Sequence, residues 1–145
     1  MTKNNVKAIT IAIMALIPVF FGSKFFKSMG ISSENLGAYT IEELYNNRQS
    51  GVMVKFEGQI IKLLSDDNEG SRHQRFIVKI SNSHTILIAH NIDVAPRVPI
   101  KSNANIIIYG QYEWNEKGGV VHWTHADSYG THEGGWIEYN GKVYQ

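Results

Sequence analysis

The chain has 145 residues, a formal net charge of +1 at pH 7 and no cysteine. The missing cysteines exclude disulfide bonds, thiolate zinc sites and a cysteine nucleophile. Four lysines precede the first acidic residue, Glu34, so the other ten basic residues face thirteen acidic ones, a net charge of −3. This balance argues against nonspecific binding of nucleic acid, which needs a basic surface.

The N-terminal segment is typical of a signal peptide. Lys3 and Lys7 precede an uncharged, largely apolar run over residues 8–22. No cleavage site with small residues follows the run, which favours an uncleaved anchor. We therefore predict a signal peptide or membrane anchor over residues 1–27 and a polar linker over 28–39. The domain is expected to be exported, either anchored on the periplasmic side of the inner membrane or, if cleaved, periplasmic or secreted.

About 115 residues remain after the N-terminal segment, which suits a single core, and residues 40–145 are predicted to form one domain. Thr40 and Glu43 have the spacing of a capping box and open a short helix that ends near Gln49. A strand bent at a bulge near Gly58 should follow. Alternating apolar side chains then predict four more strands and, with them, a small five-stranded OB-like Greek-key barrel, mainly β. The five strands are expected over residues 52–64, 74–80, 84–90, 104–114 and 119–125.

The tail of this domain concentrates residues able to bind metal. Three of the six histidines and all three tryptophans lie between Glu113 and Trp136. Imidazole and carboxylate suit Zn and other divalent metal ions. Strand alternation, however, places residues three apart on opposite faces, and turn capping by these side chains is an equal alternative. The possible metal ligands are His122, His125, Asp127 and His132.

Basic and aromatic residues near the predicted strand ends suggest an anion site at one mouth of the barrel. Arginine offers forked donors to phosphate or carboxylate, and histidine titrates near neutral pH. The alternative is that these residues have only structural roles. Arg97 would then brace its loop against Asp93, and the tryptophans would pack in the core or at its rim. The ligand-binding candidates are Arg72, His73, Arg97, Trp114, Trp123 and Trp136; the catalytic candidates are His73, His90, Asp93 and His125.

Several separated motifs occur together in the last 95 or so residues. They are His-Gln-Arg-Phe at 73–76, Ala-His-Asn-Ile-Asp-Val-Ala-Pro-Arg-Val at 89–98, Tyr-Glu-Trp-Asn at 112–115, Gly-Gly-Val-Val-His-Trp-Thr-His at 118–125, Gly-Gly-Trp at 134–136 and the closing Gly-Lys-Val-Tyr-Gln. In this order they resemble the uncharacterised bacterial family domain of unknown function 3465. One departure is Asp127-Ser128, where the family pattern has Asp-Pro. The resemblance implies a short exported or membrane-anchored protein and assigns no catalytic residue.

Together these features predict an exported OB-like binding module. Its ligand is expected to be anionic, such as an oligonucleotide or saccharide fragment, held at a mouth rich in His, Arg and Trp. A metal-dependent hydrolase, similar to a nuclease or phosphodiesterase and using the C-terminal His and Asp residues, is one alternative. A structural envelope protein is another.

Overall fold

The structure is a computed structural model that describes residues 41–145. The predicted signal peptide or anchor over residues 1–27 and the linker over 28–39 lie outside these described residues. Within residues 41–145, no helix combines the length and the apolar character needed to cross a membrane.

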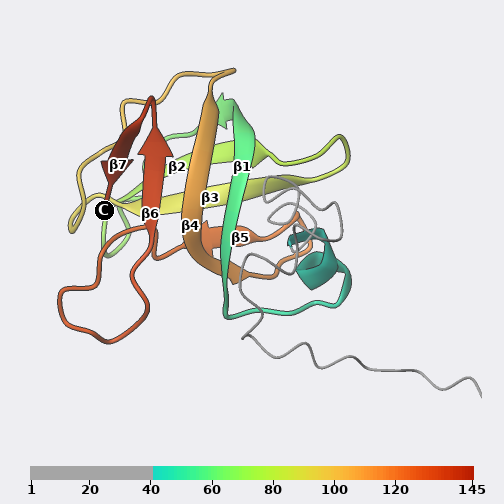
Figure 1. Cartoon of the computed structure of the whole chain (residues 1–145), viewed down its shortest axis with the longest axis horizontal. Coiled ribbons are helices and arrows are strands. Elements are labelled where there is room, and N and C mark those ends of the chain that lie inside the picture. The colour runs from blue at the N-terminus through green and yellow to red at the C-terminus, as the bar shows by residue number, and fades with distance from the viewer. Residues whose placement is uncertain (1–40) are drawn as a thin grey trace, which may run out of the picture.

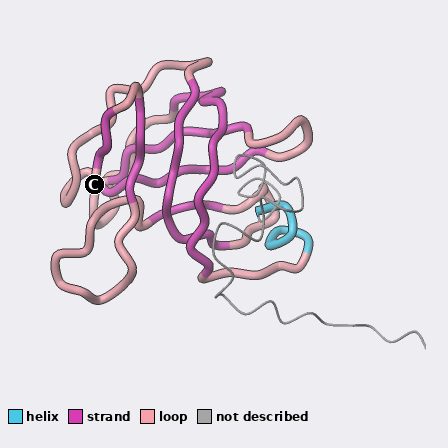
Figure 2. Tube along the Cα trace, viewed as in Figure 1, coloured by secondary structure: helices cyan, strands magenta, loops and turns pink. Residues whose placement is uncertain are grey.

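A short helix over residues 41–46 precedes seven strands (Figures 1 and 2). The first five strands close a barrel in the order β1-β2-β3-β5-β4, with β4 pairing back to β1. The β3–β5 pair is parallel and the other pairs are antiparallel. The prediction of a five-stranded OB-like Greek-key barrel is thus confirmed. The strands are β1 (Val52–Leu63), β2 (His73–Lys79), β3 (Thr85–Asn91), β4 (Asn105–Glu113), β5 (Val120–His122), β6 (Trp136–Tyr139) and β7 (Lys142–Tyr144).

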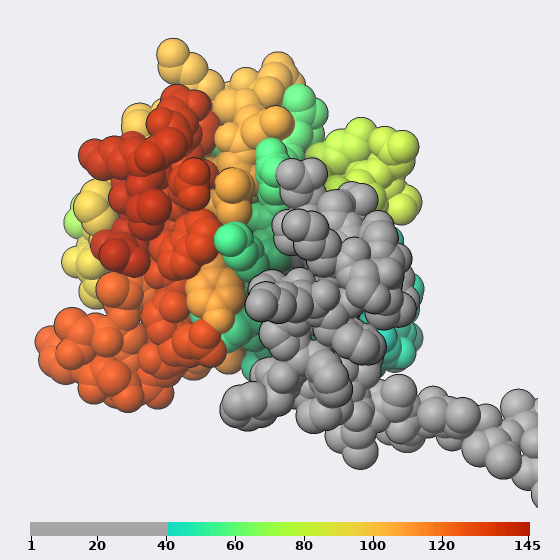
Figure 3. All heavy atoms as spheres, viewed as in Figure 1, coloured from blue at the N-terminus to red at the C-terminus, as the bar shows by residue number. Residues whose placement is uncertain are grey.

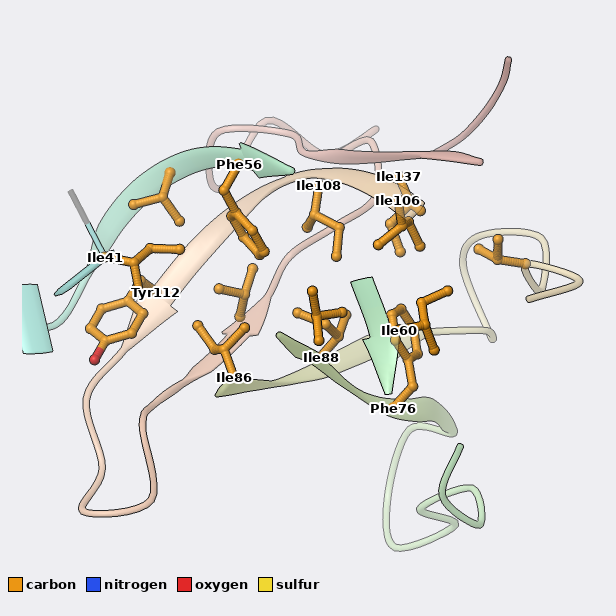
Figure 4. Packing of buried hydrophobic residues seen from close by; sticks show 14 of the residues in the cluster. Ile41, Phe56, Ile60, Phe76, Ile86, Ile88, Ile106, Ile108, Tyr112 and Ile137 are labelled. Carbon is orange, nitrogen blue, oxygen red and sulfur yellow. The ribbon is translucent and has the colours of Figure 1, made fainter. Parts of the chain in front are cut away.

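Alternation along the strands builds the core, as the pleat requires. Every second residue of β2, β3 and β4 is buried, while the residues between them are only partly covered. Figure 4 shows these side chains meeting inside the barrel, with Ile41 of the short helix beside Tyr112 at one end. The helix therefore closes this end of the barrel, and the opposite end lies where β1 ends and β2 begins.

The bend in β1 lies later than predicted. Its register against β2 shifts between Ile60 and Lys62, so the predicted bulge is present but lies at Ile61 instead of near Gly58. Gly58 has a different role. A β-carbon there would clash with the Val78 side chain and the Lys79 carbonyl oxygen. Glycine therefore allows β1 to cross closely over β2, and the extra residue at Ile61 is what bends the strand.

The C-terminal part differs most from the prediction. The last barrel strand ends at His122, three residues earlier than expected, because Trp123 adopts a left-handed backbone conformation (φ 52°). A hairpin of β6 and β7, which was not predicted, then extends the sheet beyond the barrel. The edge of β4 that pairs with β5 at Gln111–Glu113 pairs with β6 at Ile107–Tyr109. In Figure 3 this red hairpin lies against the orange β4, and the loop over residues 123–135 projects below it.

Candidate functional site

Two ion pairs hold the loops at the open end of the barrel. Arg72 donates from its backbone N–H and from Nε to the two carboxylate oxygens of Asp93, both at 2.7 Å. These hydrogen bonds hold the pKa of Asp93 below its ordinary value. Arg97 pairs with Asp66 in the β1–β2 loop. The expectation that Arg97 braces its loop against Asp93 was therefore wrong, because Arg72 occupies that carboxylate.

A pocket of about 250 Å³ opens at this end of the barrel. It lies between the end of β1, the start of β2 and the connection that follows β3. Two arginines line it: Arg97, and Arg75, whose Nε donates to the Ser65 carbonyl oxygen at 3.0 Å. The sequence indicated a ligand-binding role for Arg97, whereas it favoured a structural role for Arg75. The lining residues are Leu63, Leu64, Gln74, Arg75, Arg97, Val98, Pro99 and Ile100.

Gln74 fixes one wall of this pocket. Its buried amide donates from Nε2 to the Val98 carbonyl oxygen at 2.8 Å and accepts from the Val98 N–H at 3.0 Å. The side chain thus supplies the partner that the Val98 N–H lacks in the irregular connection, whereas the Val98 carbonyl oxygen also accepts from the Ile100 N–H at 2.8 Å. A signal for this role was present in the sequence, since Gln74 is the only polar residue on the inward face of β2.

His90, a predicted catalytic residue, is fully buried. Its Nε2 lies 3.0 Å from the Pro96 carbonyl oxygen, and its Nδ1 lies 2.8 Å from Thr124 Oγ1. Since the carbonyl oxygen can only accept, Nε2 carries the proton and the threonine hydroxyl donates to Nδ1 in the neutral ring. Burial lowers the pKa of His90, which favours this neutral form. His90 thereby connects the loop after β3 to the segment after β5.

Arg75, which lines the pocket, leaves β2 on the outer face of the barrel, the face on which His122 also lies. Arg75 pairs in register with Ala89, and extension of the β3–β5 register places His122 on the other side of Ala89. His122 Nε2 is buried without a hydrogen bond among the described residues, with Glu113 Oε1 3.6 Å away. Burial lowers the pKa of His122, and the neighbouring His73 and His132 lower it further, against the raising effect of Glu113.

Trp123 begins a stack of aromatic rings over the 123–135 loop. The His132 ring lies parallel to the indole at 3.9 Å, and the His122 ring lies tilted at 5.1 Å from it. His125 meets His132 edge-on at 5.4 Å. The left-handed backbone of Trp123 is what brings His122 and its successors to one side, which strand alternation alone did not predict.

Asp127 organises the same loop. Its carboxylate accepts hydrogen bonds from the backbone N–H groups of Tyr129, Thr131 and His132 and from the Thr131 hydroxyl. These bonds, with that from His132 the largest cause, hold the pKa of Asp127 well below its ordinary value. His132 Nε2 lies 4.0 Å from Asp127 Oδ2. Across residues 41–145, no group of three or more His, Asp or Glu side chains is placed to hold a metal ion.

The three tryptophans lie in three separate places. Trp114 packs against Tyr45, donates from Nε1 to the Tyr45 carbonyl oxygen at 3.0 Å and lies under the Arg48 guanidinium. Trp136 packs against Tyr109 and under Lys55 Nζ. Trp123 has imidazoles beside it, as described above. The predicted ligand-binding tryptophans therefore do not form one platform.

His73 lies between the arginines at the open end of the barrel and His122 on its outer face. Its Nδ1 lies 2.8 Å from the Ser71 carbonyl oxygen, and its charge affects the pKa of His90, Asp93 and His122. The structure therefore brings Arg72, His73, Asp93 and Arg97 to the open end of the barrel, while His122, His125, Asp127 and His132 gather around Trp123. The roles assigned to these residues stay predictions.

Comparison with known proteins agrees with the motifs described above. A search of curated proteins returned no match. The model of the family described as "Protein of unknown function (DUF3465)" matches residues 25–145, a longer stretch than the motifs alone indicated. This match covers most of the chain, and the protein therefore belongs to the DUF3465 family.

Proposed function

We propose that this domain is a binding module that takes an anionic ligand at the open end of its barrel. The observation that carries the proposal is the pocket of about 250 Å³ lined by Arg75 and Arg97. In each guanidinium group, most of the N–H donors make no hydrogen bond to the other described residues. Arg75 gives Nε to Ser65, and Arg97 gives one terminal nitrogen to Asp66, so each retains N–H groups for a phosphate or carboxylate.

The charge around the pocket also suits an anion. Asp66 is the only carboxylate in contact with the two lining arginines among the described residues, so the lining retains a positive excess. His73, next to Arg72 at the start of β2, adds a cation when it is protonated. The fragment of an oligonucleotide or acidic saccharide expected from the sequence would present one such anionic group to the pocket. The volume lies just below the usual range of ligand pockets and admits one phosphate- or carboxylate-bearing unit.

A titration of the full-length protein with four probes tests this proposal. The probes are three anions, namely a short oligothymidylate, a trigalacturonate and octanoate, and the neutral maltotriose, and binding is followed by calorimetry and thermal shift. We expect at least one of the anions to bind and maltotriose not to bind. Arg97→Gln and Arg75→Gln should each weaken binding at least tenfold, since a charged hydrogen bond contributes about 1.5–3 kcal/mol.

Arg48→Gln is the matched control, because Arg48 lies over Trp114 beside the helix that closes the opposite end of the barrel. Equal weakening by Arg48→Gln and Arg97→Gln would show general charge attraction and contradict the site. Absence of binding by every anion, with the variants folded, would refute the proposed function.

We further infer an exported location for this module, supported by the lysines and apolar run at the N-terminus. Residues 1–27 would then hold the domain on the outer side of the inner membrane. Fractionation of the full chain carrying a C-terminal tag tests this, with protease added to spheroplasts. A tag found in the cytoplasmic fraction and protected from protease would refute it.

A further inference from the structure

The lining of the pocket at the open end of the barrel points to the chemical class of its ligand. This inference rests on the proposed function and deepens it. Besides the two arginines and Gln74, the lining is aliphatic: Leu63, Leu64, Val98, Pro99 and Ile100. No aromatic side chain lines the pocket. Bases and sugar rings are commonly held by stacking on aromatic side chains, and this pocket offers none.

The tryptophans that could supply such stacking are occupied at a distance from the pocket. Trp114 packs against Tyr45 and Arg48, and Trp136 packs against Tyr109 and Lys55. Trp123 is stacked with His132. None of the three lines the pocket, so a ligand there meets only aliphatic side chains and guanidinium groups.

The polar groups of the lining are equally restricted. The Gln74 amide is buried and makes two hydrogen bonds to Val98, which leaves the two arginines as the lining side chains with the most free hydrogen-bond donors. A ligand that matches this set has one anionic head and no hydroxyl or amide groups that need partners. A nucleotide or sugar would instead bury polar groups without hydrogen bonds, at a cost in affinity.

Exposed apolar side chains lead away from the pocket. Leu63 is 45% exposed although it pairs with Phe76, whose side chain faces the core. Ile61, in the β1 bulge, is 41% exposed. Both lie at the end of β1, and Leu63 also lines the pocket. They extend the aliphatic surface of the pocket to the rim of the barrel, where an alkyl chain would cover them.

We propose that this pocket binds an aliphatic anion, with its carboxylate or phosphate head on Arg75 and Arg97 and its alkyl chain against Leu63, Pro99 and Ile100. The chain can come from a free aliphatic acid or from an acyl group of an anionic lipid. Both sources present the same chemistry to the pocket.

A homologous series of straight-chain carboxylates tests this. Butyrate, hexanoate and octanoate are titrated into the full-length protein by calorimetry. Each added CH2 that enters the pocket should lower Kd about fourfold, the effect of burying one CH2. Octyl phosphate should bind at least as tightly as octanoate, whereas the neutral octyl glucoside should bind much more weakly. Adenosine monophosphate and glucuronate are the competing probes.

Two variants locate the site, each with a control. Leu63→Gln should remove the gain with chain length but keep the head interaction, and Val143→Gln, at an equally exposed apolar position on β7, should change nothing. Arg97→Gln should weaken every probe about tenfold, and Arg48→Gln should not. Dihexanoyl phosphatidate serves as the lipid probe: tighter binding than octanoate identifies a lipid source, and weaker binding identifies a free acid.

Each result decides between the two claims. Dependence on chain length that is lost in Leu63→Gln supports the aliphatic ligand. Tighter binding of adenosine monophosphate or glucuronate, lost in Arg97→Gln, overturns the aliphatic ligand and keeps the proposed function. Binding that is unchanged in both variants overturns the pocket as the site. No binding by any probe overturns both claims.

Discussion

The buried amide of Gln74 allows the wall of the pocket to be loosened without touching its charged groups. In Gln74→Met the side chain keeps its length, but the Val98 N–H loses its partner, whereas the Val98 carbonyl oxygen still accepts from the Ile100 N–H at 2.8 Å. Val98 is 1% exposed, so water does not replace the bond to the N–H. An unpaired buried group costs about 1–3 kcal/mol. We therefore expect the free energy of unfolding to fall by about 2 kcal/mol.

Such a loss should lower Tm by about 10 °C in a domain of this size. Urea unfolding followed by tryptophan fluorescence measures it directly. Gln59→Met is the matched control, because Gln59 Nε2 also donates to a backbone carbonyl oxygen, that of Asn103, but on the exposed surface. Its loss should stay within about 0.5 kcal/mol. Similar losses in the two variants would refute the reasoning that burial of Val98 sets the magnitude.

Three further outcomes are expected. Burial lowers the pKa of His90, so below pH ~6.5 the unfolded chain binds more protons than the folded one; stability should be full above that pH and fall as pH falls, by at most about 1.4 kcal/mol per pH unit for this group. Tm measured from pH 7.5 to 5 should therefore drop less in His90→Gln, and equal slopes would contradict the assignment. Gly110→Ala would place a β-carbon 2.6 Å from the His122 carbonyl oxygen and 2.7 Å from Thr124 Cγ2, and should cost about 1–3 kcal/mol in urea unfolding; a neutral result would mean that β5 shifts freely. Asp127→Ala should speed amide hydrogen exchange at Tyr129, Thr131 and His132 by several-fold and leave β2 and β3 unchanged, whereas unchanged loop exchange would show that the Trp123–His132 stack alone holds the loop.

Strand alternation predicted the barrel because it is a local property of the chain. Gln74, Phe76 and Val78 occupy one face of β2 in the structure as they do in the pattern. The early end of β5 was not predicted, since nothing in the residues around Trp123 announces a left-handed backbone at a tryptophan. It arises from tertiary context, where Gly110 and Gly135 let the segment that follows β5 pack closely against β4.

The missed β6–β7 hairpin had a local signal. Asn140 and Gly141 both have positive φ, as a two-residue hairpin turn requires, and this dipeptide between short apolar runs is a strong hairpin indicator. The ion pairs at the open end of the barrel had no such signal. Arg72 reaches Asp93 and Arg97 reaches Asp66 across loops, so their partners depend on barrel closure, which residue spacing does not encode.

The strand pairs that close the barrel also determine how fast the chain folds. β1 pairs with β4, which joins Val52 to Tyr112, 60 positions later, and β3 pairs with β5, which joins Leu87 to Val120. Such distant pairings place folding on the slow side, in milliseconds to seconds. A nascent chain that stops before Val120 exposes the edges of β3 and β4 and can pair with other chains. Completion of β5, three residues long, is thus the step that protects the protein from aggregation.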